Sequence, residues 1–171
     1  KAHQQLIDEN ALPGAAARLD QSEAAAERLV SEGYVRIGLD HFALPTDSLV
    51  AAQREGRMRR NFQGYTTDSA QTLLGLGASS IGSLPQGLVQ NIAQELPWRA
   101  AVVAGDLPIA RGVVVTDEDR FRGEIIERLM CDLAVDLGQV CDRHGRTLAG
   151  LSNELSDLRG FADDGLVVMQ G

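Results

Sequence analysis

The sequence predicts a mixed α/β fold over residues 1–85 and a mainly helical fold over residues 86–171. The first prediction rests on the helix-forming run Ala15–Glu32, its stop at Gly33 and the β-branched run Tyr34–Leu39 behind it. This order of elements matches the last two-thirds of a βαβ unit. The second prediction rests on a change of character along the chain, from glycine-rich loops to amphipathic helices.

The N-terminal segment, residues 1–14, is expected to be a loop because it ends in a proline–glycine turn signal. Residues 34–39 are expected to form a lone parallel strand, whose partner would precede Lys1. A short helix is predicted over residues 47–56, with Thr46 as its N-cap and a glycine as its stop.

The most unusual stretch is Arg59–Thr67, in which Phe62 and Tyr65 are interleaved with amide, guanidinium, hydroxyl and glycine groups. No helix or strand period explains it, so we expect a loop built for contact. The glycine-rich turn Gly75–Ile81 follows. It begins like a dinucleotide fingerprint, but Ser80 replaces the third glycine and the expected acidic residue is missing, which disfavours a Rossmann fold.

In the second half, Pro97 and Gly105 frame a predicted helix over residues 97–104, and residues 107–115 suit a strand. Thr116 caps the next helix, whose first turn is acidic. We expect this helix to be the core of a second domain. Its apolar face comprises Phe121, Ile125, Leu129 and Leu133, with Ile126 and Met130 beside them.

The last part of the chain is predicted to contain one more helix and one strand. Ser152–Phe161 has helical spacing through Leu155 and Leu158. An Asp-Asp-Gly turn then leads into Leu166–Met169, which looks like the first strand of a hairpin.

The composition is typical of a soluble globular protein, with 44% hydrophobic and 23% charged residues in a chain of 171. The net charge of −8 disfavours binding to nucleic acid or to an anionic membrane, because both demand a basic surface. No apolar run is long enough to span a bilayer, and the N-terminus has no signal-peptide core. We therefore expect a cytoplasmic protein with no membrane partner.

Two cysteines, Cys131 and Cys141, are too few for a disulfide framework. Cys131 lies in an apolar helical run, where a reduced and buried thiol is expected. Adding His144 gives a Cys-x9-Cys-x2-His pattern that lacks a fourth ligand and close cysteine spacing. The sequence therefore predicts no metal site within this chain.

Four arginines fall within seven residues, at Arg54, Arg57, Arg59 and Arg60. One interpretation is a solvated, positively charged loop. The other is a site for carboxylates or phosphates, which guanidinium groups bind in a fork geometry.

Five motifs in order resemble a known enzyme family. They are Gly38-Leu39-Asp40-His41-Phe42-Ala43, Ala52-Gln53-Arg54-Glu55-Gly56, Arg60-Asn61-Phe62-Gln63-Gly64-Tyr65-Thr66-Thr67, Leu74-Gly75-Leu76-Gly77-Ala78-Ser79-Ser80-Ile81 and Gln90-Asn91. The family is oxygen-independent coproporphyrinogen III oxidase, a radical S-adenosylmethionine enzyme of haem biosynthesis. Related haem chaperones share the layout but do not typically carry the Asn-Phe-Gln-Gly-Tyr string.

The resemblance implies an oxidoreductase that decarboxylates two propionates of coproporphyrinogen III to vinyl groups, giving protoporphyrinogen IX. It implies two molecules of S-adenosyl-L-methionine per active site, a 4Fe-4S cluster and an external electron donor. The cluster and cofactor carry the hard chemistry. Two alternatives stay open: a haem-binding or chaperone relative without oxidase activity, and a non-catalytic interaction module.

The fold that the resemblance implies is the C-terminal end of a partial β/α (TIM-like) barrel followed by a winged-helix-like helical domain. The family holds its cluster with Cys-x3-Cys-x2-Cys, whereas the two cysteines here are ten positions apart. The cluster ligands are therefore expected upstream of Lys1. As a C-terminal fragment the chain is expected to be inactive alone and to dimerise through an unpaired strand edge, whereas the full-length enzyme would be a monomer.

Phe62, Gln63 and Ile81 match positions that lie beside S-adenosylmethionine in this family. Phe62 would offer a flat apolar face to adenine, Gln63 an amide that donates and accepts, and Ile81 a hydrophobic wall. Gly75 and Gly77 would let the backbone approach a ligand closely. The alternative for Phe62 and Ile81 is ordinary core packing.

The substrate carries four propionates, so we expect Arg59 or Arg60 to hold one of them by a charge-assisted contact. His41 could serve as a polar group at the barrel mouth. A structural histidine is favoured, because the sequence shows no partner for it. No catalytic residue can be assigned from this chain.

Overall fold

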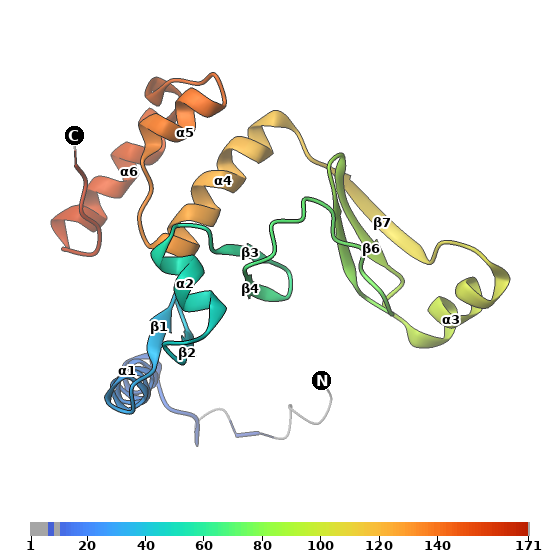
Figure 1. Ribbon diagram of the computed structural model, residues 1–171, viewed down its shortest axis with the longest axis horizontal. Helices are drawn as coiled ribbons and strands as arrows, with labels where there is room; N and C mark the ends of the chain where they lie inside the picture. Colours follow the sequence, from blue (N-terminus) through green and yellow to red (C-terminus); the bar gives the residue numbers. More distant parts are fainter. Residues whose placement is uncertain (1–6, 9–10, 171) are drawn as a thin grey trace.

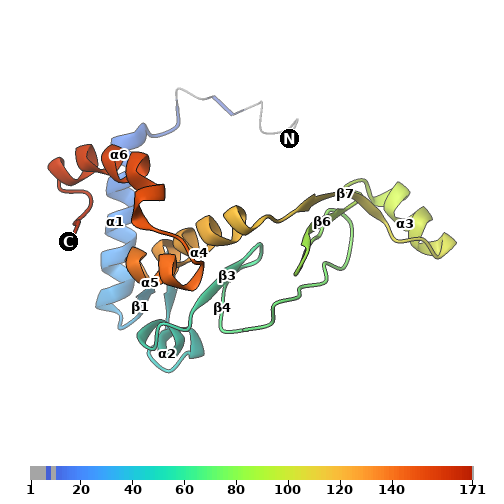
Figure 2. The same cartoon turned by 90° about the horizontal axis from the view of Figure 1, so that it is seen from above.

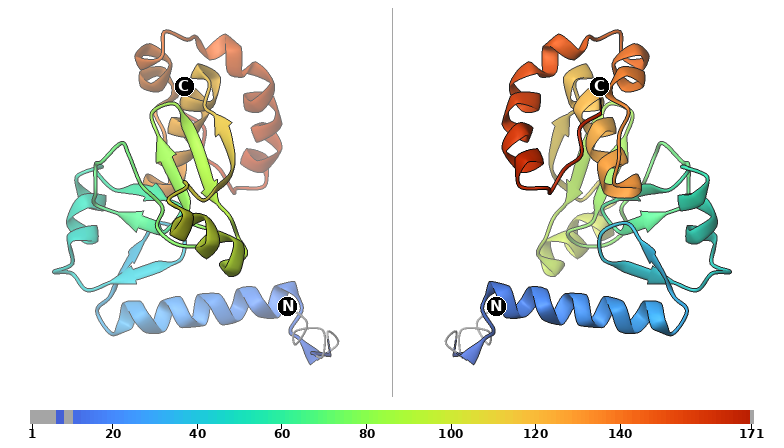
Figure 3. Two further views of the ribbon diagram at one scale, coloured as in Figure 1. Left: turned by 90° about the vertical axis from the view of Figure 1, so that its right-hand side faces the viewer. Right: turned by 90° about the vertical axis from the view of Figure 1, so that its left-hand side faces the viewer.

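The computed structural model describes residues 7–8 and 11–170, and these form an elongated, open arrangement (Figure 1). Most of the loop expected over residues 1–14 lies outside the described residues. Figure 2 shows the sheet of β5, β6 and β7 with α3 at one end of the molecule and α1, α5 and α6 at the other. Figure 3 shows α1 well separated from α6.

The first elements confirm the predicted order but not the predicted pairing. Helix α1 (Ala15–Ser31) is followed by strand β1 (Val35–Ile37), as expected. Strand β1 pairs antiparallel with β2 (His41–Ala43), so the expected lone parallel strand is wrong. The reason is Gly38, whose φ of +54° lets the chain reverse directly after β1.

Helix α2 (Ser48–Arg54) confirms the helix predicted over residues 47–56, but its N-cap is Asp47 and not Thr46. The Asp47 carboxylate accepts a hydrogen bond of 2.8 Å from the backbone N–H of Leu49. Asp and Thr are both good N-caps, so residue type alone could not separate two neighbouring candidates.

The stretch expected to be an irregular loop is a β-hairpin. Strands β3 (Arg59–Asn61) and β4 (Gly64–Thr66) pair antiparallel, with Phe62 and Gln63 at the tip. The Asn61 side chain accepts a 2.7 Å hydrogen bond from the backbone N–H of Gln63, which closes the turn. Strands of three residues are too short to show a recognisable alternation, which is why the sequence did not reveal them.

A three-stranded antiparallel sheet contains β5 (Ile81–Leu84), β6 (Gly87–Asn91) and β7 (Ile109–Val114), in that order. Only β7 was predicted. Helix α3 (Glu95–Ala104) connects β6 to β7 and begins two residues before its predicted start. The expected boundary at residue 85 falls in the turn between β5 and β6, so this sheet contains residues from both sides of it. A division into two domains stays a prediction.

The rest of the described chain is helical, as predicted, except at its end. It contains α4 (Asp117–Asp132), α5 (Leu137–Arg143), the 3-10 helix η3 (Leu148–Leu151) and α6 (Ser152–Asp163), of which α5 and η3 were not expected. Thr116 caps α4 in a capping box with Asp119. The strand expected at Leu166–Met169 is wrong, because this segment is irregular and pairs with no strand of the described chain.

Two apolar cores contain residues from different ends of α4. The first comprises Ile37, Ala43, Val50, Ala52, Met58 and Cys131. The second comprises Phe121, Val140, Cys141 and Leu151, with Ile125 packed against it. The apolar face expected for α4 is therefore confirmed at Phe121 and Ile125, but it is wrong at Leu129 and Leu133. Leu129 is 45% exposed and Leu133 is 63% exposed. Ile126, expected beside that face, is also exposed, at 55%.

The chain leaves an unusually large surface in contact with water. Its accessible area is 12,645 Å², whereas a compact monomer of 18.3 kDa would expose roughly 8,100 Å². All six residues of the edge strand β7 are exposed. None of the helices in the described part of the chain is long and apolar enough to cross a membrane.

Ion pairs on Glu124 join α4 to Arg143 of α5 and to His144, the residue after it. One carboxylate oxygen accepts a 2.8 Å hydrogen bond from Nε of Arg143, and the other lies 2.7 Å from Nε2 of His144. Partial burial raises the pKa of Glu124, but the hydrogen bonds from His144 and Arg143 outweigh that effect and lower the pKa below its ordinary value of 4.5.

We expect Glu124→Gln to lower the free energy of unfolding near neutral pH by about 1–2 kcal/mol, because charge-assisted hydrogen bonds are lost. The pKa of Glu124 is lower in the folded state, so its stabilisation is present above the ordinary value of 4.5 and is lost as the pH falls below it. The difference between variant and wild type should therefore shrink in acid. Urea unfolding followed by circular dichroism at about pH 7 and about pH 3.5 measures it.

Asp157→Asn is the matched control, because this exposed carboxylate makes no ion pair with another described residue. Its stability difference from wild type should be small at both pH values. A Glu124→Gln difference that stays constant from neutral to acid pH would contradict the assigned role of the ion pairs.

Candidate functional site

The tip of the β3–β4 hairpin presents two chemically useful side chains to solvent. Phe62 is 57% exposed although it is a large apolar residue, and Gln63 beside it is exposed as well. The turn is fixed by the Asn61 side chain and by Gly64, whose φ is +129°. An aromatic face and an amide are therefore held on a defined turn and are not packed in either apolar core.

Ile81 is the first residue of β5 and follows the glycine-rich turn. The Asn91 side-chain amide donates hydrogen bonds of 3.1 Å and 2.9 Å to the carbonyl oxygens of Gly75 and Gly77. A Cβ at Gly75 would lie 2.9 Å from the carbonyl carbon of Ile81, so only glycine fits there. The turn is thereby held against β6, and Ile81 stays half-buried.

The structure brings Phe62 and Gln63 together but does not join them to Ile81. The hairpin and the β5–β6–β7 sheet are separate in both Figure 1 and Figure 2. No described hydrogen bond or cavity includes Ile81 with either tip residue. None of the three is sealed inside an apolar core. Their common role stays a prediction.

The two arginines proposed for substrate binding differ in the contacts that their side chains make. The Arg60 guanidinium lies 5.3 Å from the ring centroid of Tyr65 and donates to the Met130 sulfur at 3.6 Å. The Arg59 side chain makes no ion pair or hydrogen bond with another described residue. It lines an open depression of about 550 Å³ together with Thr67 and Ser69, and with Glu124, Glu127 and Arg128 of α4. Of these two arginines, Arg59 is the one whose guanidinium has no partner among the described residues.

His41 has partners that the sequence did not reveal. Its Nδ1 lies 2.7 Å from a carboxylate oxygen of Asp40, and its ring meets the Tyr65 ring edge to face with centroids 5.0 Å apart. Both contacts agree with a structural histidine. The neighbouring Asp40 was visible in the sequence, whereas Tyr65 lies far along the chain.

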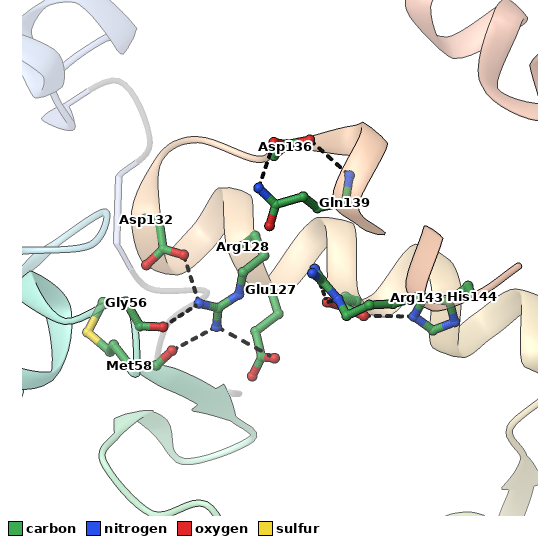
Figure 4. Close-up of polar contacts among 10 residues, drawn as sticks. Gly56, Met58, Glu127, Arg128, Asp132, Asp136, Gln139, Arg143 and His144 are labelled. Atoms are coloured by element: carbon green, nitrogen blue, oxygen red, sulfur yellow. Dashed lines mark hydrogen bonds and ion pairs between the residues drawn. The ribbon is translucent and has the colours of Figure 1, made fainter. Parts of the chain in front are cut away.

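Sequence reasoning missed Arg128, which fixes the segment that leads into β3 (Figure 4). Its guanidinium donates to the backbone carbonyls of Gly56 at 3.2 Å and Met58 at 2.8 Å, and to the Asp132 carboxylate at 2.7 Å. The spacing of Arg128 and Asp132, four residues apart on a predicted helix, was the only available signal. The carbonyl contacts join parts of the chain about 70 residues apart.

The described residues do not fit a 4Fe-4S cluster. Cys131 and Cys141 belong to different apolar cores and both are buried. Burial raises the pKa of the Cys131 thiol, which disfavours the thiolate that a metal needs. No group of three or more His, Cys, Asp or Glu side chains in the described part of the chain is arranged to hold a metal ion.

No family model matches the chain, but close relatives do. It is 48% identical over all 171 residues to an oxygen-independent coproporphyrinogen III oxidase of Bradyrhizobium diazoefficiens, and spans 38% of that protein. It is 41% identical over 169 residues to a protein of the same name from Thermostichus vulcanus, of which it spans 52%. The chain thus spans between about a third and a half of the length of these relatives.

A solved structure gives the same result. The chain superposes on coproporphyrinogen III oxidase (HemN) from Escherichia coli, described as a radical SAM enzyme, with a TM-score of 0.90 and 34% identity. The match covers 99% of this chain and 39% of that one. By sequence and by fold, this chain belongs with the oxygen-independent coproporphyrinogen III oxidases, of which it represents one part.

Proposed function

We propose that these residues serve an oxygen-independent coproporphyrinogen III oxidase, which converts two propionates of coproporphyrinogen III to vinyl groups and yields protoporphyrinogen IX. The observation that carries the proposal is the 48% identity to the Bradyrhizobium diazoefficiens protein, which extends over every residue of this chain. Because the chain spans 38% of that protein, we assign the activity to an enzyme of the relative's length.

Within that enzyme, S-adenosylmethionine and a 4Fe-4S cluster bound elsewhere would supply the radical chemistry. The hairpin tip is suited to bind the adenosine part of the cofactor. Phe62 would stack on adenine, and the Gln63 amide would donate to and accept from its polar edge. The support is that both side chains face solvent on a fixed turn. Ile81 would add an apolar wall.

We propose that Arg59 holds a propionate of the substrate. A guanidinium without another partner in the described chain can form a charge-assisted contact with a carboxylate. The hydroxyl groups of Thr67 and Ser69 line the same depression and could accept or donate further hydrogen bonds. Arg60 is unsuited, because its guanidinium is already stacked on Tyr65.

We also propose the finer architecture that the family implies. Residues 1–85 would complete a partial β/α (TIM-like) barrel, and residues 86–171 would form a winged-helix-like domain. The support is the TM-score of 0.90 to the Escherichia coli enzyme.

The exposed strand β7 supports dimerisation of the isolated chain. Two buried free thiols fit a reducing cytoplasm.

Phe62→Ala and Gln63→Ala, made in the complete enzyme, should each raise the dissociation constant for S-adenosylmethionine by about tenfold, because a stacking surface or an amide contact is lost. Equilibrium dialysis with labelled cofactor measures it. Phe161→Ala and Gln86→Ala are matched controls, since Phe161 is 51% exposed on α6 and Gln86 lies in the β5–β6 turn. Wild-type affinity in both tip variants would overturn the assignment.

Arg59→Ala should raise the KM for coproporphyrinogen III by about tenfold, through loss of one charge-assisted contact, with little effect on the KM for S-adenosylmethionine. Arg60→Ala should leave the KM for the porphyrinogen nearly unchanged. Anaerobic assays of protoporphyrinogen formation under reducing conditions test both variants. If the complete wild-type protein forms no product there, the non-catalytic alternatives gain support. An unchanged KM in Arg59→Ala would remove the propionate site only.

A further inference from the structure

Tyr65 lies where three separate segments of the chain meet. Its hydroxyl accepts a 3.0 Å hydrogen bond from the backbone N–H of Leu39, which belongs to the turn after β1. The same hydroxyl donates a 2.9 Å hydrogen bond to the backbone carbonyl of Met130, in the last turn of α4. One phenolic group thus uses its donor and an acceptor site to tie β4 to two elements that are distant in sequence.

The ring of Tyr65 also has defined contacts, in addition to the hydrogen bonds of its hydroxyl. The His41 ring meets it edge to face at 89°, and the Arg60 guanidinium lies over it. Gly38 leaves the space that the ring occupies, because a Cβ added there would overlap the ring atoms of Tyr65. The environment therefore specifies both the position and the orientation of this side chain.

The β3–β4 hairpin needs such an external attachment. Its strands form only three residue pairs, and an isolated two-stranded hairpin of this length is not stable in water. Figures 1 and 2 both show β3 beside α4. The Glu127 side chain accepts a 3.3 Å hydrogen bond from the backbone N–H of Arg60, which adds a second, longer contact. Tyr65, two residues from Gln63, is the tightest link between the hairpin and the body.

We propose that Tyr65 is a positioning residue that holds the Phe62–Gln63 tip in place for S-adenosylmethionine, by fixing the hairpin to α4 and to the turn after β1. This inference rests on the proposed function of the tip. Tyr65 itself makes no contact with the cofactor in this scheme. It acts through the backbone of β4, which continues from Tyr65 through Gly64 into the tip.

The test is Tyr65→Phe in the complete enzyme, because phenylalanine keeps the ring contacts and removes both hydrogen bonds. The dissociation constant for S-adenosylmethionine should rise roughly tenfold, since the tip must be ordered on binding. Its KM should rise in parallel, whereas kcat at saturating cofactor should change by less than about twofold. Tyr34→Phe is the matched control, because the Tyr34 hydroxyl makes no hydrogen bond with another described residue.

Hydrogen exchange followed by mass spectrometry gives a second readout that does not depend on activity. In Tyr65→Phe the amides of Leu39 and of residues 59–66 should exchange about tenfold faster, while those of α6 should not change. Faster exchange throughout the protein would indicate a general loss of stability and would overturn the proposal. Unchanged exchange in the hairpin would overturn it as well.

The outcomes separate this inference from the proposed function. If Phe62→Ala and Gln63→Ala weaken cofactor binding but Tyr65→Phe does not, the tip binds the cofactor without help from Tyr65. If the tip variants bind like wild type, the cofactor site itself is wrong and the positioning role falls with it. A fall in kcat without a change in affinity would assign Tyr65 to another step.

Discussion

Helix α4 is the constraint on which the rest of the structure depends, because both apolar cores use it. Phe121 near its start belongs to one core and Cys131 near its end belongs to the other. The capping box at Thr116 fixes where the helix begins, and so fixes which residues face each core. A single helix therefore connects the core of the helical region to the core beneath the β1–β2 hairpin.

Polar groups near the end of α4 form hydrogen bonds with the hairpin that carries the candidate cofactor site and with the segment before it. The Arg128 guanidinium holds the carbonyl groups of Gly56 and Met58, and the Met130 carbonyl accepts from Tyr65. The first two of these contacts precede the β3–β4 hairpin in sequence, and the third is made by its second strand. They are modest individually, but each uses a fixed backbone partner, so together they restrict the hairpin to one position.

Local signals predicted those elements that local interactions specify. Helices α1, α4 and α6 have apolar residues at helical spacing over several turns. The structure also confirms the start of α4 after Thr116 and the end of α1 before Gly33. The hairpin at residues 59–66 could not be predicted, because its three-residue strands carry no period and depend on Tyr65 reaching α4. The segment at 166–169 shows the reverse case, since a β-branched run forms no strand without a partner.

The candidate site, too, could be predicted from the sequence only in part. The residue types at the tip suggested a contact surface, and family resemblance pointed to its ligand. Neither could show that Arg59 is free while Arg60 is stacked, because that depends on the cross-strand pairing of Arg60 with Tyr65. A one-residue shift of register would exchange the two arginines between the faces of the hairpin. The register thus decides which guanidinium can meet a substrate.

A hairpin tip that binds a ligand through Phe62 would need to leave this ring exposed. Leaving this ring 57% exposed forgoes on the order of 1 kcal/mol of burial free energy, which a hairpin of three residue pairs cannot recover from its own contacts. The contacts of Tyr65 and Arg128 offset that loss outside the tip. Burial of the ring is then still available to a ligand, and a tip that is already ordered gives up less entropy when it binds.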